Sequence, residues 1–493
     1  MFLGVKHFQV HTSNDPKVLV DAMIGDLREP LVDPFAKEKV LVESRGMATW
    51  LQLQMTDQLS ICANVDFASP GKLIEDLLVG FLGEEVEYFS AYSKENLVWR
   101  IYDLLLGLCK EYPGEFAEPA RYLVKGESDR ALRLSWELSI LIEKYMTYRP
   151  GMMLQWLEGQ VDQEEHSWQA HLWRAVRESI GSVLSFPELW RMCMEREFKD
   201  PAGSLPERLS VFGVSALPPA YLDILGLYAH YGAVNVYLQQ PAPVFWGDHQ
   251  LEGWKQRTLE QVGWFCGREV EPADLYIQTG NPLIASLGKT GREFYHLLCD
   301  QEAEHVLLDY TMPAENSILA CLQRSLFSVF NDSPEEPVLY NPKDESIVIN
   351  NCHGPMREVE VLKDYLLRRL DDDSTLYPGE IIVMMPDPEK YVPYIRAVLG
   401  SENEGVPRLP YSLVDREPRQ ESLYLDTFLD LAEFMVSRAS NQDVMELLGA
   451  LPIRSKFGLE EEDLEAFAHW IRECHVHWGL DADHRESIGS IPS

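Results

Sequence analysis

The sequence contains no run of roughly 18 or more apolar residues, and its start, MFLGVKHFQVHTS, has no long apolar segment of the signal-peptide kind. It also contains no C-x-x-C pair, because its eight cysteines are scattered between residues 62 and 474. Such spacing in a long chain is typical of reduced, mostly buried thiols. These absences predict a cytoplasmic protein that has no membrane partner.

The chain has far fewer basic than acidic residues. The chain carries 43 basic and 79 acidic residues, for a net charge of −36. A surface this negative repels phosphate at long range, which argues against a sequence-blind DNA coat or a binder of anionic membranes. A local basic channel inside an acidic shell remains compatible with nucleic-acid binding.

The 493 residues, 46% of them hydrophobic, are enough for two to four folded domains. Residues 1–75 have an α/β pattern, with a helix in PKVLVDAMIGDLREP and a buried strand at 40–42. The same pattern returns in residues 205–330, where a strand (Leu209–Val214), a helix (Pro219–Tyr231) and a strand (Val234–Leu238) follow one another. We therefore predict one discontinuous α/β domain.

Long helices with mixed apolar and charged faces occupy 95–111, 129–148 and 164–184. They predict a helical subdomain, residues 76–204, inserted into the α/β domain.

A segment rich in Pro, Asp, Glu, Asn and Ser predicts a linker over residues 331–345. Beyond it, the strands SIVINNC and EIIVMMPD flank the helix MREVEVLKDYLLRRLDDD. This pattern predicts the start of a second α/β domain over 346–493, which ends before its sheet is complete.

The stretch KVLVESRGMATWLQLQM reads as a strand, a turn at Arg45-Gly46 and a helix, which is the place of a phosphate-binding P-loop. A P-loop needs G-x-x-x-x-G-K-[ST], but this turn has one glycine and no lysine. The one G-K-T, at residues 288–290, has Leu283 where a glycine is required and follows the helix-like NPLIASL. We interpret it as a surface turn.

A nucleotide motor also needs a strand that ends in acidic residues to hold magnesium, whereas the corresponding strand here reads VFGVSALPP. The group of histidines and a cysteine in HWIRECHVHWG lacks a second ligand pair, so half-buried or solvated side chains are favoured over a metal site. The sequence thus predicts no catalytic residue, no metal site and no cofactor in this chain.

Arg149 ends a long predicted helix in Tyr148-Arg149-Pro150, which fixes its position. It could contact nucleic acid, or it could belong to a solvated helix end. Twelve tryptophans and 21 tyrosines could stack on bases, although most aromatic residues at helical spacing belong to a core.

Several segments in one order and spacing carry a family resemblance: SRGMATWLQ, ANVDF, YRPGMMLQW, VSALPPAYL, FWGD, GNPLIASLGKTGREF, REVEVLKD, VMMPDPEKYVPYIRAVLG and LPYSLVDR. Along nearly its whole length the chain resembles the RecC family, the gamma subunits of the bacterial RecBCD complex (exodeoxyribonuclease V). The resemblance implies a fold of superfamily-one helicase type whose motor sites have decayed. RecC proteins are more than twice as long, so we expect a truncated chain without the nuclease-like domain that meets RecB and RecD.

The resemblance also implies a channel that guides single-stranded DNA and inspects it for the recombination hotspot Chi on its way to the RecB nuclease. The family's channel positions correspond to Glu43, Arg45, Thr49, Ser69, Glu75, Leu141, Glu143 and Arg149. The family turn commonly reads S-T-G-M-A-Q-W, so Arg45 and Thr49 depart from it, and Glu75 replaces an aromatic residue. Base reading depends on such side chains, so the hotspot sequence itself does not carry over.

Three functions are compatible with these observations. The first is a non-catalytic subunit of a RecBCD-type complex that binds single- and double-stranded DNA and acts in double-strand-break repair by homologous recombination. RecB-like and RecD-like partners would then use ATP and magnesium in this exonuclease and helicase complex. The second is an active ATP-dependent DNA helicase, and the third is a purely structural interaction protein. ATP turnover and single-stranded DNA binding distinguish the three.

Overall fold

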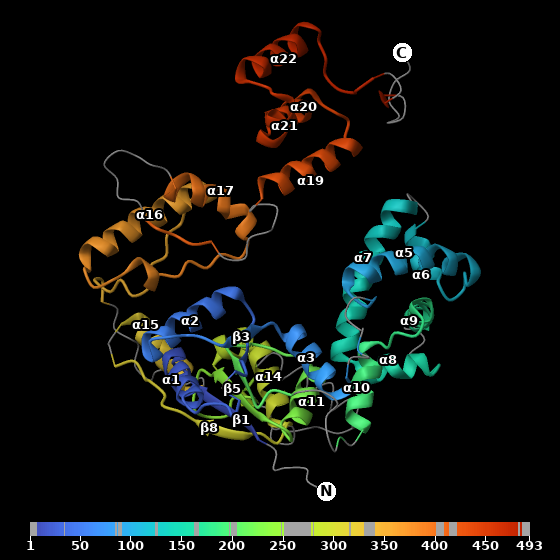
Figure 1. Cartoon of the computed structure of the whole chain (residues 1–493). Helices are drawn as coiled ribbons and strands as arrows, with labels where there is room; N and C mark the ends of the chain where they lie inside the picture. The colour runs from blue at the N-terminus through green and yellow to red at the C-terminus, as the bar shows by residue number, and fades with distance from the viewer. Residues whose placement is uncertain are drawn as a thin grey trace. The chain divides into compact units, whose positions relative to one another are not determined.

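The computed structural model describes residues 7–33, 35–83, 86, 91–123, 127–161, 167–196, 198, 205–247, 249–250, 278–279, 281–314, 317–329, 341–400, 409–413, 422–481 and 484–485. The chain divides into two compact units, Met1–Ile347 and Val348–Ser493 (Figure 1). Each unit is described by itself.

The first unit is built on a sheet of six strands in which every neighbouring pair is parallel, in the order β3, β2, β4, β5, β1, β8. The strands are β1 (Phe8–Ser13), β2 (Glu38–Leu41), β3 (Val65–Ala68), β4 (Arg208–Phe212), β5 (Ala233–Gln239) and β8 (Glu304–Leu307). Because the strands are parallel, all of their carboxyl ends meet at one edge of the sheet. This sheet confirms the α/β class and the predicted order of strand, helix and strand over 208–239.

Helices cover both faces of the sheet, so adjacent residues of one strand enter different cores. Val40 of β2 packs with α1 (Pro16–Leu27) and α2 (Arg45–Leu59). The next residue, Leu41, belongs to the larger core on the opposite face. That core includes residues of α3 (Pro70–Leu82), α11 (Pro219–Tyr228) and α14 (Lys289–Cys299). Burial on both faces accounts for the nearly continuous apolar runs in these strands.

Between α3 and β4 the described residues form six helices. They are α5 (Lys94–Glu111), α6 (Ala117–Leu123), α7 (Glu127–Tyr148), α8 (Pro150–Leu157), α9 (Ser167–Ile180) and α10 (Phe186–Glu195). Their core contains Phe116, Trp156 and Trp173, and it is continuous with the core under α3 and α11. The long helices predicted from the sequence are therefore present, while the subdomain limits at 76 and 204 stay a prediction.

Smaller elements complete the first unit. The two-residue strands β6 (His249–Gln250) and β7 (Gln278–Thr279) pair in parallel. They are followed by α13 (Pro282–Leu287) and, after β8, by α15 (Ile318–Ser328). Residues 331–340 of the predicted linker lie outside the described part of the chain.

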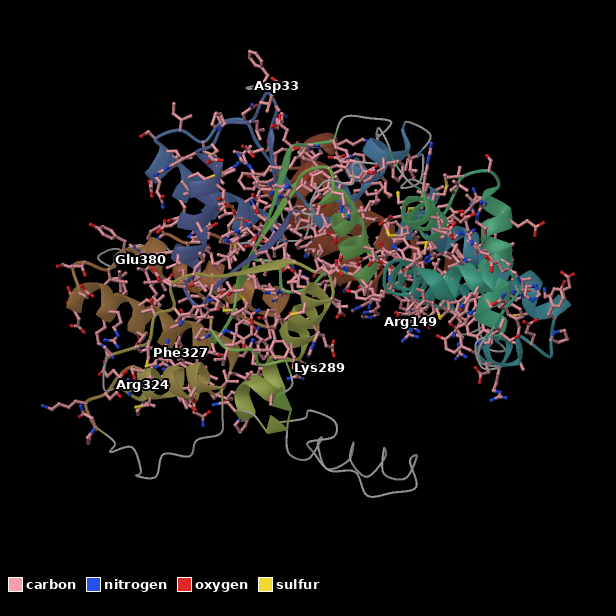
Figure 2. All side chains as sticks on the ribbon, turned by 90° about the horizontal axis from the view of Figure 1, so that it is seen from below. Asp33, Arg149, Lys289, Arg324, Phe327 and Glu380 are labelled. Carbon is pink, nitrogen blue, oxygen red and sulfur yellow. The ribbon has the colours of Figure 1, made fainter. Side chains whose placement is uncertain are left out.

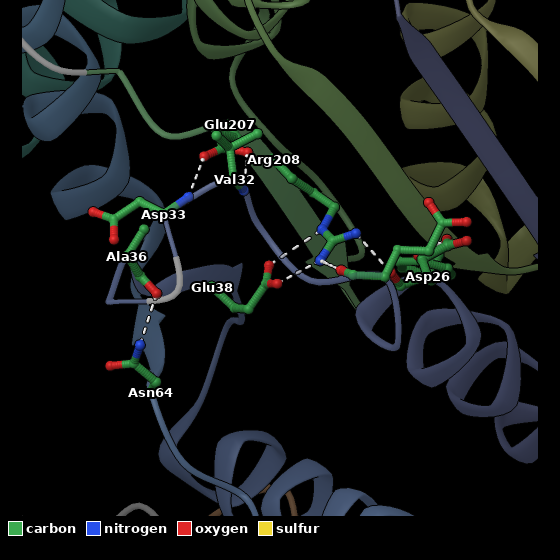
Figure 3. A network of polar contacts seen from close by, with 10 residues as sticks. Asp26, Val32, Asp33, Ala36, Glu38, Asn64, Glu207 and Arg208 are labelled. Atoms are coloured by element: carbon green, nitrogen blue, oxygen red, sulfur yellow. Dashed lines mark hydrogen bonds and ion pairs between the residues drawn. The ribbon is translucent and has the colours of Figure 1, made fainter.

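An arginine ties the amino ends of β2 and β4 together (Figure 3). The Arg208 guanidinium on β4 forms an ion pair with Glu38 on β2 and donates to the backbone carbonyls of Asp26 and Glu29, at 2.6 and 3.0 Å. The neighbouring Glu207 accepts from the backbone N–H groups of Val32 and Asp33, at 3.0 and 3.3 Å. These contacts fix the edge of the sheet opposite to the one that carries the site described below.

The second unit contains two groups of helices. The first consists of α16 (Pro355–Asp372), the 3-10 helix η3 (Pro378–Glu380) and α17 (Pro388–Leu399), with a small core around Val359 and Ile395. The second consists of α19 (Leu423–Val436), α20 (Asn441–Gly449), α21 (Leu451–Phe457) and α22 (Glu461–Glu473).

Two predicted strands of the second unit, at 346–352 and 380–387, are not formed. Their residues are largely without regular structure, apart from bends at 346–347 and 386 and the end of η3, and they form no backbone ladder with the described strands. The prediction of these two strands was wrong, because an apolar pattern forms a strand only where a neighbouring strand pairs with it.

The expectation of mostly buried cysteines was also wrong. The seven cysteines in the described residues are all free, but only Cys193 is buried, whereas Cys299 and Cys474 are exposed. The two exposed thiols lie at the ends of α14 and α22, where the chain leaves the packed helix face. In the part of the chain that the structure describes, no helix is both long and apolar enough to cross a membrane.

Candidate nucleic-acid interface

The carboxyl edge of the sheet contains a point at which the chain turns in opposite directions. From β2 the chain continues through α2 to β3 on one side, and from β4 it continues through α11 to β5 on the other side. Ligands of open α/β sheets bind in the crevice outside such a switch point. Here the switch point lies between the turn after β2 and the turn after β4.

The turn after β2 carries three of the predicted channel residues. Glu43 precedes Ser44, which caps α2 by accepting a hydrogen bond from the Met47 N–H at 3.1 Å. Arg45 is the first residue of the helix and is exposed, as is Thr49 one turn later. The Thr49 hydroxyl donates to the Arg45 carbonyl at 3.0 Å, so it still has free lone pairs to accept a hydrogen bond.

The chain's own side chains occupy this switch point. The Glu43 carboxylate accepts from the N–H of Ser215, which follows β4, at 2.9 Å and from its hydroxyl at 3.0 Å. Gly213 has a φ of +63°, and a Cβ at this position would lie 3.0 Å from the Met47 Cε. Met47 therefore packs directly over the glycine, and a carboxylate lies where a phosphate would need hydrogen-bond donors.

Ser69 and Glu75 belong to the adjacent strand and helix. The backbone of Val42 pairs with Ala68 at 3.1 Å, so Glu43 and Ser69 leave the sheet side by side. Ser69 precedes α3, is exposed, and makes no side-chain capping bond. Its hydroxyl is thus open at the same edge as Glu43.

Glu75 lies in a charged network on α3. It forms an ion pair with Lys72 at 3.0 Å, and Lys72 also pairs with Asp76 at 3.0 Å. Lys39 of β2 bridges Asp76 to Asp66, at 3.0 and 2.6 Å. Burial raises the pKa of Asp76, but the hydrogen bonds from Lys72 and Lys39 outweigh it and hold that pKa below its ordinary value. The Glu75 carboxylate is therefore already paired with Lys72.

Leu141, Glu143 and Arg149 lie at the end of α7. Leu141 is half-buried and packs against the core, whereas Glu143 and Arg149 are exposed. Arg149 separates α7 from α8 because the following Pro150 disfavours a helical conformation for the residue before it, and its φ of −138° and ψ of 51° are not helical.

The Arg149 side chain has no recorded partner. Figure 2 shows it at the surface of the helices that follow α3. Among the residues that the structure describes, no ion pair or hydrogen bond is recorded for its guanidinium. In particular, no ion pair joins Arg149 to Glu143.

Tyr221 of α11 connects two of these groups. Its hydroxyl lies 4.0 Å from the place of a Cβ on Gly71, at the start of α3. Burial, and then the nearby Glu143 and Tyr148 of α7, raise the pKa of Tyr221 to about 12. Tyr221 thus lies near the start of α3, which follows Ser69 and carries Glu75, and near the end of α7. Leu141 does not join them, since its side chain faces the core.

The sequence indicated neither Tyr221 nor Ser215 as part of the site. Both lie in VSALPPAYL, the segment after β4, and the position of a residue just beyond a parallel strand is the signal that could have revealed Ser215.

The G-K-T segment lies outside this edge. Gly288 separates α13 from α14, and Lys289 begins α14 with its side chain mostly exposed and 4.0 Å from Glu293. The prediction of a helix rather than a strand before it is confirmed. Of the described residues, no group of three or more His, Cys, Asp or Glu side chains is placed to hold a metal ion.

Two family models match the chain. Residues 8–328 match the model described as RecC, N-terminal domain, and residues 421–492 match that of the RecBCD enzyme subunit RecC fourth domain. These spans include the switch point and the α19–α22 helices, respectively.

Curated relatives of the chain are RecC subunits as well. The chain is 33% identical to the RecBCD enzyme subunit RecC of Escherichia coli K12, over 92% of this chain and 43% of that protein. It is 28% identical to the same subunit of Haemophilus influenzae, over 96% of this chain and 46% of that protein. For Mycolicibacterium smegmatis the identity is 29%, over 97% and 44%. The chain therefore spans somewhat less than half the length of these relatives, and it belongs to the RecC family.

Proposed function

We propose that this chain is the DNA-guiding part of a non-catalytic subunit in a RecBCD-type complex. It holds single-stranded DNA and scans it for the hotspot Chi during double-strand-break repair. RecB-like and RecD-like subunits supply ATP hydrolysis, magnesium and the nuclease. The names of the relatives support the assembly, since each is a RecBCD enzyme subunit.

One observation carries the DNA-guiding role. At the switch point Met47 packs over Gly213 and the Glu43 carboxylate accepts from Ser215, so an acceptor lies where a nucleotide phosphate would need donors. Around it, Arg45 and Ser69 are exposed at the sheet edge, and Arg149 is exposed on the insertion. A guanidinium without a partner suits a phosphate or the face of a base, and this holds even on a chain with a net charge of −36.

The helicase alternative requires the same crevice to hold ATP, and no contact described above favours it. A purely structural role predicts that the chain does not bind single-stranded DNA. Binding of a fluorescent oligonucleotide by the chain co-purified with its RecB- and RecD-type subunits separates this role from DNA guiding.

The decisive experiment replaces Arg149 in that co-purified complex. Arg149→Ala should leave ATP turnover and unwinding nearly unchanged and weaken the response to the hotspot, with a loss of about 1–3 kcal/mol of discrimination if the arginine contacts a base. Arg133→Ala is the matched control, because Arg133 is also exposed and lies on α7, the helix that ends just before Arg149. If Arg149→Ala keeps the full hotspot response and only lowers the melting temperature, Arg149 is structural and the proposed role of this helix is wrong.

A further inference from the structure

The G-K-T segment lies outside the sheet edge, but it supports a loop that begins there. This loop, residues 240–247, leaves the carboxyl end of β5. Its Trp246 is 4% exposed, and the indole N–H donates to the side-chain carbonyl of Gln240, at the other end of the loop. The tryptophan therefore closes the loop on itself and anchors it.

Two glycines beside Lys289 make room for this tryptophan. A Cβ on Gly288 would lie 2.9 Å from the Trp246 Cζ3, and a Cβ on Gly291 would lie 3.6 Å from its Cη2. Carbon atoms do not approach to the first of these distances without a shift, so the indole lies directly against the backbone of the G-K-T turn. This packing, rather than a nucleotide phosphate, accounts for Gly288.

The anchored loop presents an aromatic ring to solvent. Phe245 is 44% exposed, and its ring contacts those of Tyr295 and His296 on α14, with centroids 5.4 Å apart in each case. A Cβ on Gly247 would lie 2.3 Å from the Phe245 Cζ and 2.7 Å from the His296 Nε2, so a side chain there would push the two rings apart. The Phe245 ring is thus held in one place while part of it stays open.

A cation lies on the same face of α14 as His296. Lys289 precedes His296 by almost two full turns, which is about 10 Å along the helix. Its side chain is 73% exposed, and Figure 2 shows it at the surface of the first unit. Its ion-pair partner, Glu293, is 65% exposed and 4.0 Å away, so this pair is weak. An open aromatic ring and a loosely paired ammonium group are therefore within reach of one extended strand.

The order of the strands places this ring next to the candidate interface. In the sheet β2, β4 and β5 are consecutive, so the end of β5 lies about 10 Å from the end of β2. The turn after β2 carries Arg45, and the turn after β3 carries Ser69. The loop after β5 thus continues the same row of strand ends.

We propose that Phe245 is a stacking platform for a base of single-stranded DNA and that Lys289 contacts a phosphate of the same strand. Trp246 and Gly288 position the ring. Every base has an aromatic face, so this platform holds the strand without reading its sequence, while the lysine offsets the charge of the backbone. The inference rests on the proposed DNA-guiding role and adds two DNA contacts to it.

Crosslinking in the complex co-purified with RecB- and RecD-type subunits tests the stacking. The probe is single-stranded oligothymidine that contains 5-iodouracil, a base that crosslinks under ultraviolet light to an aromatic ring stacked on it. In the absence of ATP, the crosslinked peptide of this chain should contain Phe245. Phe245→Leu should remove that crosslink, and Phe245→Tyr should keep it. Phe35→Leu is the matched control, because Phe35 is 88% exposed but precedes β2, at the opposite edge of the sheet.

Salt dependence tests the lysine. Each phosphate contact with a single strand contributes about 0.7 to the slope of log affinity against log salt concentration. Lys289→Gln should therefore reduce that slope by about 0.7 when the same complex binds fluorescent oligothymidine. Lys37→Gln should leave the slope unchanged, because Lys37 is exposed but also precedes β2.

The outcomes distinguish this inference from the proposed function. A crosslink within this chain that Phe245→Leu does not change refutes the platform and leaves the DNA-guiding role in place, and an unchanged slope for Lys289→Gln refutes the phosphate contact. If no part of this chain crosslinks, the inference and the DNA-guiding role are both wrong. Loss of the RecB- or RecD-type subunit from the Phe245→Leu complex would also overturn the inference, because the ring would then be a contact between subunits.

Discussion

The Glu43 carboxylate accepts two hydrogen bonds from Ser215, one from the backbone N–H at 2.9 Å and one from the hydroxyl at 3.0 Å. The two residues follow β2 and β4, which are neighbours in the sheet but lie far apart in the sequence. Their contact closes the switch point between the turn that precedes α2 and the turn that precedes α11.

The strength of this contact can be measured with a double-mutant cycle of Glu43→Ala and Ser215→Ala. We expect a coupling free energy of about 0.5–1 kcal/mol, because the acceptor is charged but solvent reaches it. Urea unfolding of the four proteins gives the value. The control is Thr49→Ala, since Thr49 bonds only its own helix, and its effect should add to that of Ser215→Ala without coupling. A coupling of zero for Glu43 and Ser215 would mean that the contact does not hold the two turns together.

Nucleotide binding gives a second prediction. The isolated chain should neither bind nor hydrolyse ATP, because the turn before α2 has no lysine and the Glu43 carboxylate lies at the switch point, while Lys289 begins a helix that follows another helix, α13. Equilibrium dialysis with labelled ATP and magnesium measures this. Micromolar binding that is lost in Lys289→Ala would show that the G-K-T segment is a true phosphate site.

A third prediction concerns pH and the ion pair that joins α9 to α10. Arg177 donates to Glu188 at 2.7 Å, and each side chain is 17% exposed. Burial raises the pKa of Glu188, but the bonds from Arg177 and Ser185 outweigh it and hold that pKa below its ordinary value of 4.5. The charged form is therefore favoured by folding, so its stabilising effect is present above pH 4.5 and is lost as the pH falls through the lower folded pKa.

Glu188→Gln should consequently lower the free energy of unfolding by about 1–3 kcal/mol at neutral pH. The difference from the unmodified chain should shrink below the ordinary glutamate pKa. Thermal unfolding followed by circular dichroism from neutral to acidic pH measures both effects. Glu158→Gln is the control, because the Glu158–Arg191 pair is far more exposed and should contribute only about 0–1 kcal/mol. Equal effects of the two variants at all pH values would contradict the prediction.

The predicted linker gives a fourth test. Limited proteolysis should first cut within 331–345 and leave an N-terminal fragment that melts cooperatively, because that fragment contains the complete six-stranded sheet. The fragment after the cut should be less stable, since its extended segments are unpaired. Primary cleavage within 209–238, with 331–345 intact, would contradict this division of the chain.

The sequence predicted those elements of the first unit whose apolar pattern is plain, such as β4, α11 and β5. It did not reveal β1, although this strand lies inside the sheet. The reason is that β1 buries three polar residues, His11, Thr12 and Ser13, which break the apolar pattern. His11 is accommodated by stacking on Tyr237, with ring centroids 5.0 Å apart, a contact that no local pattern reports.

Only part of the candidate site could be predicted from the sequence. The position of Glu43 after a strand and that of Arg149 at a helix end follow from local signals, whereas Ser69 followed only from the family resemblance. The Glu43–Ser215 bonds and the position of Tyr221 depend on which strands and helices become neighbours, and this is decided by the packing of the whole sheet. For the same reason the apolar pattern of 346–352 predicted a strand wrongly, because no neighbouring strand in the described part of the chain pairs with it.

The pairing of β1 has a consequence for synthesis on the ribosome. Phe8 of β1 pairs with Val234 of β5, and Gln9 pairs with Glu304 of β8, so both neighbours of this first strand are made long after it. At translation rates of roughly 5–20 residues per second, β1 waits roughly 10–50 s before β5 has left the ribosome. During that time Phe8 and Val10, which are fully buried in the finished sheet, have no sheet to enter. The nascent chain therefore exposes the unpaired Phe8 and Val10 side chains, and we expect chaperones to bind there until the sheet closes.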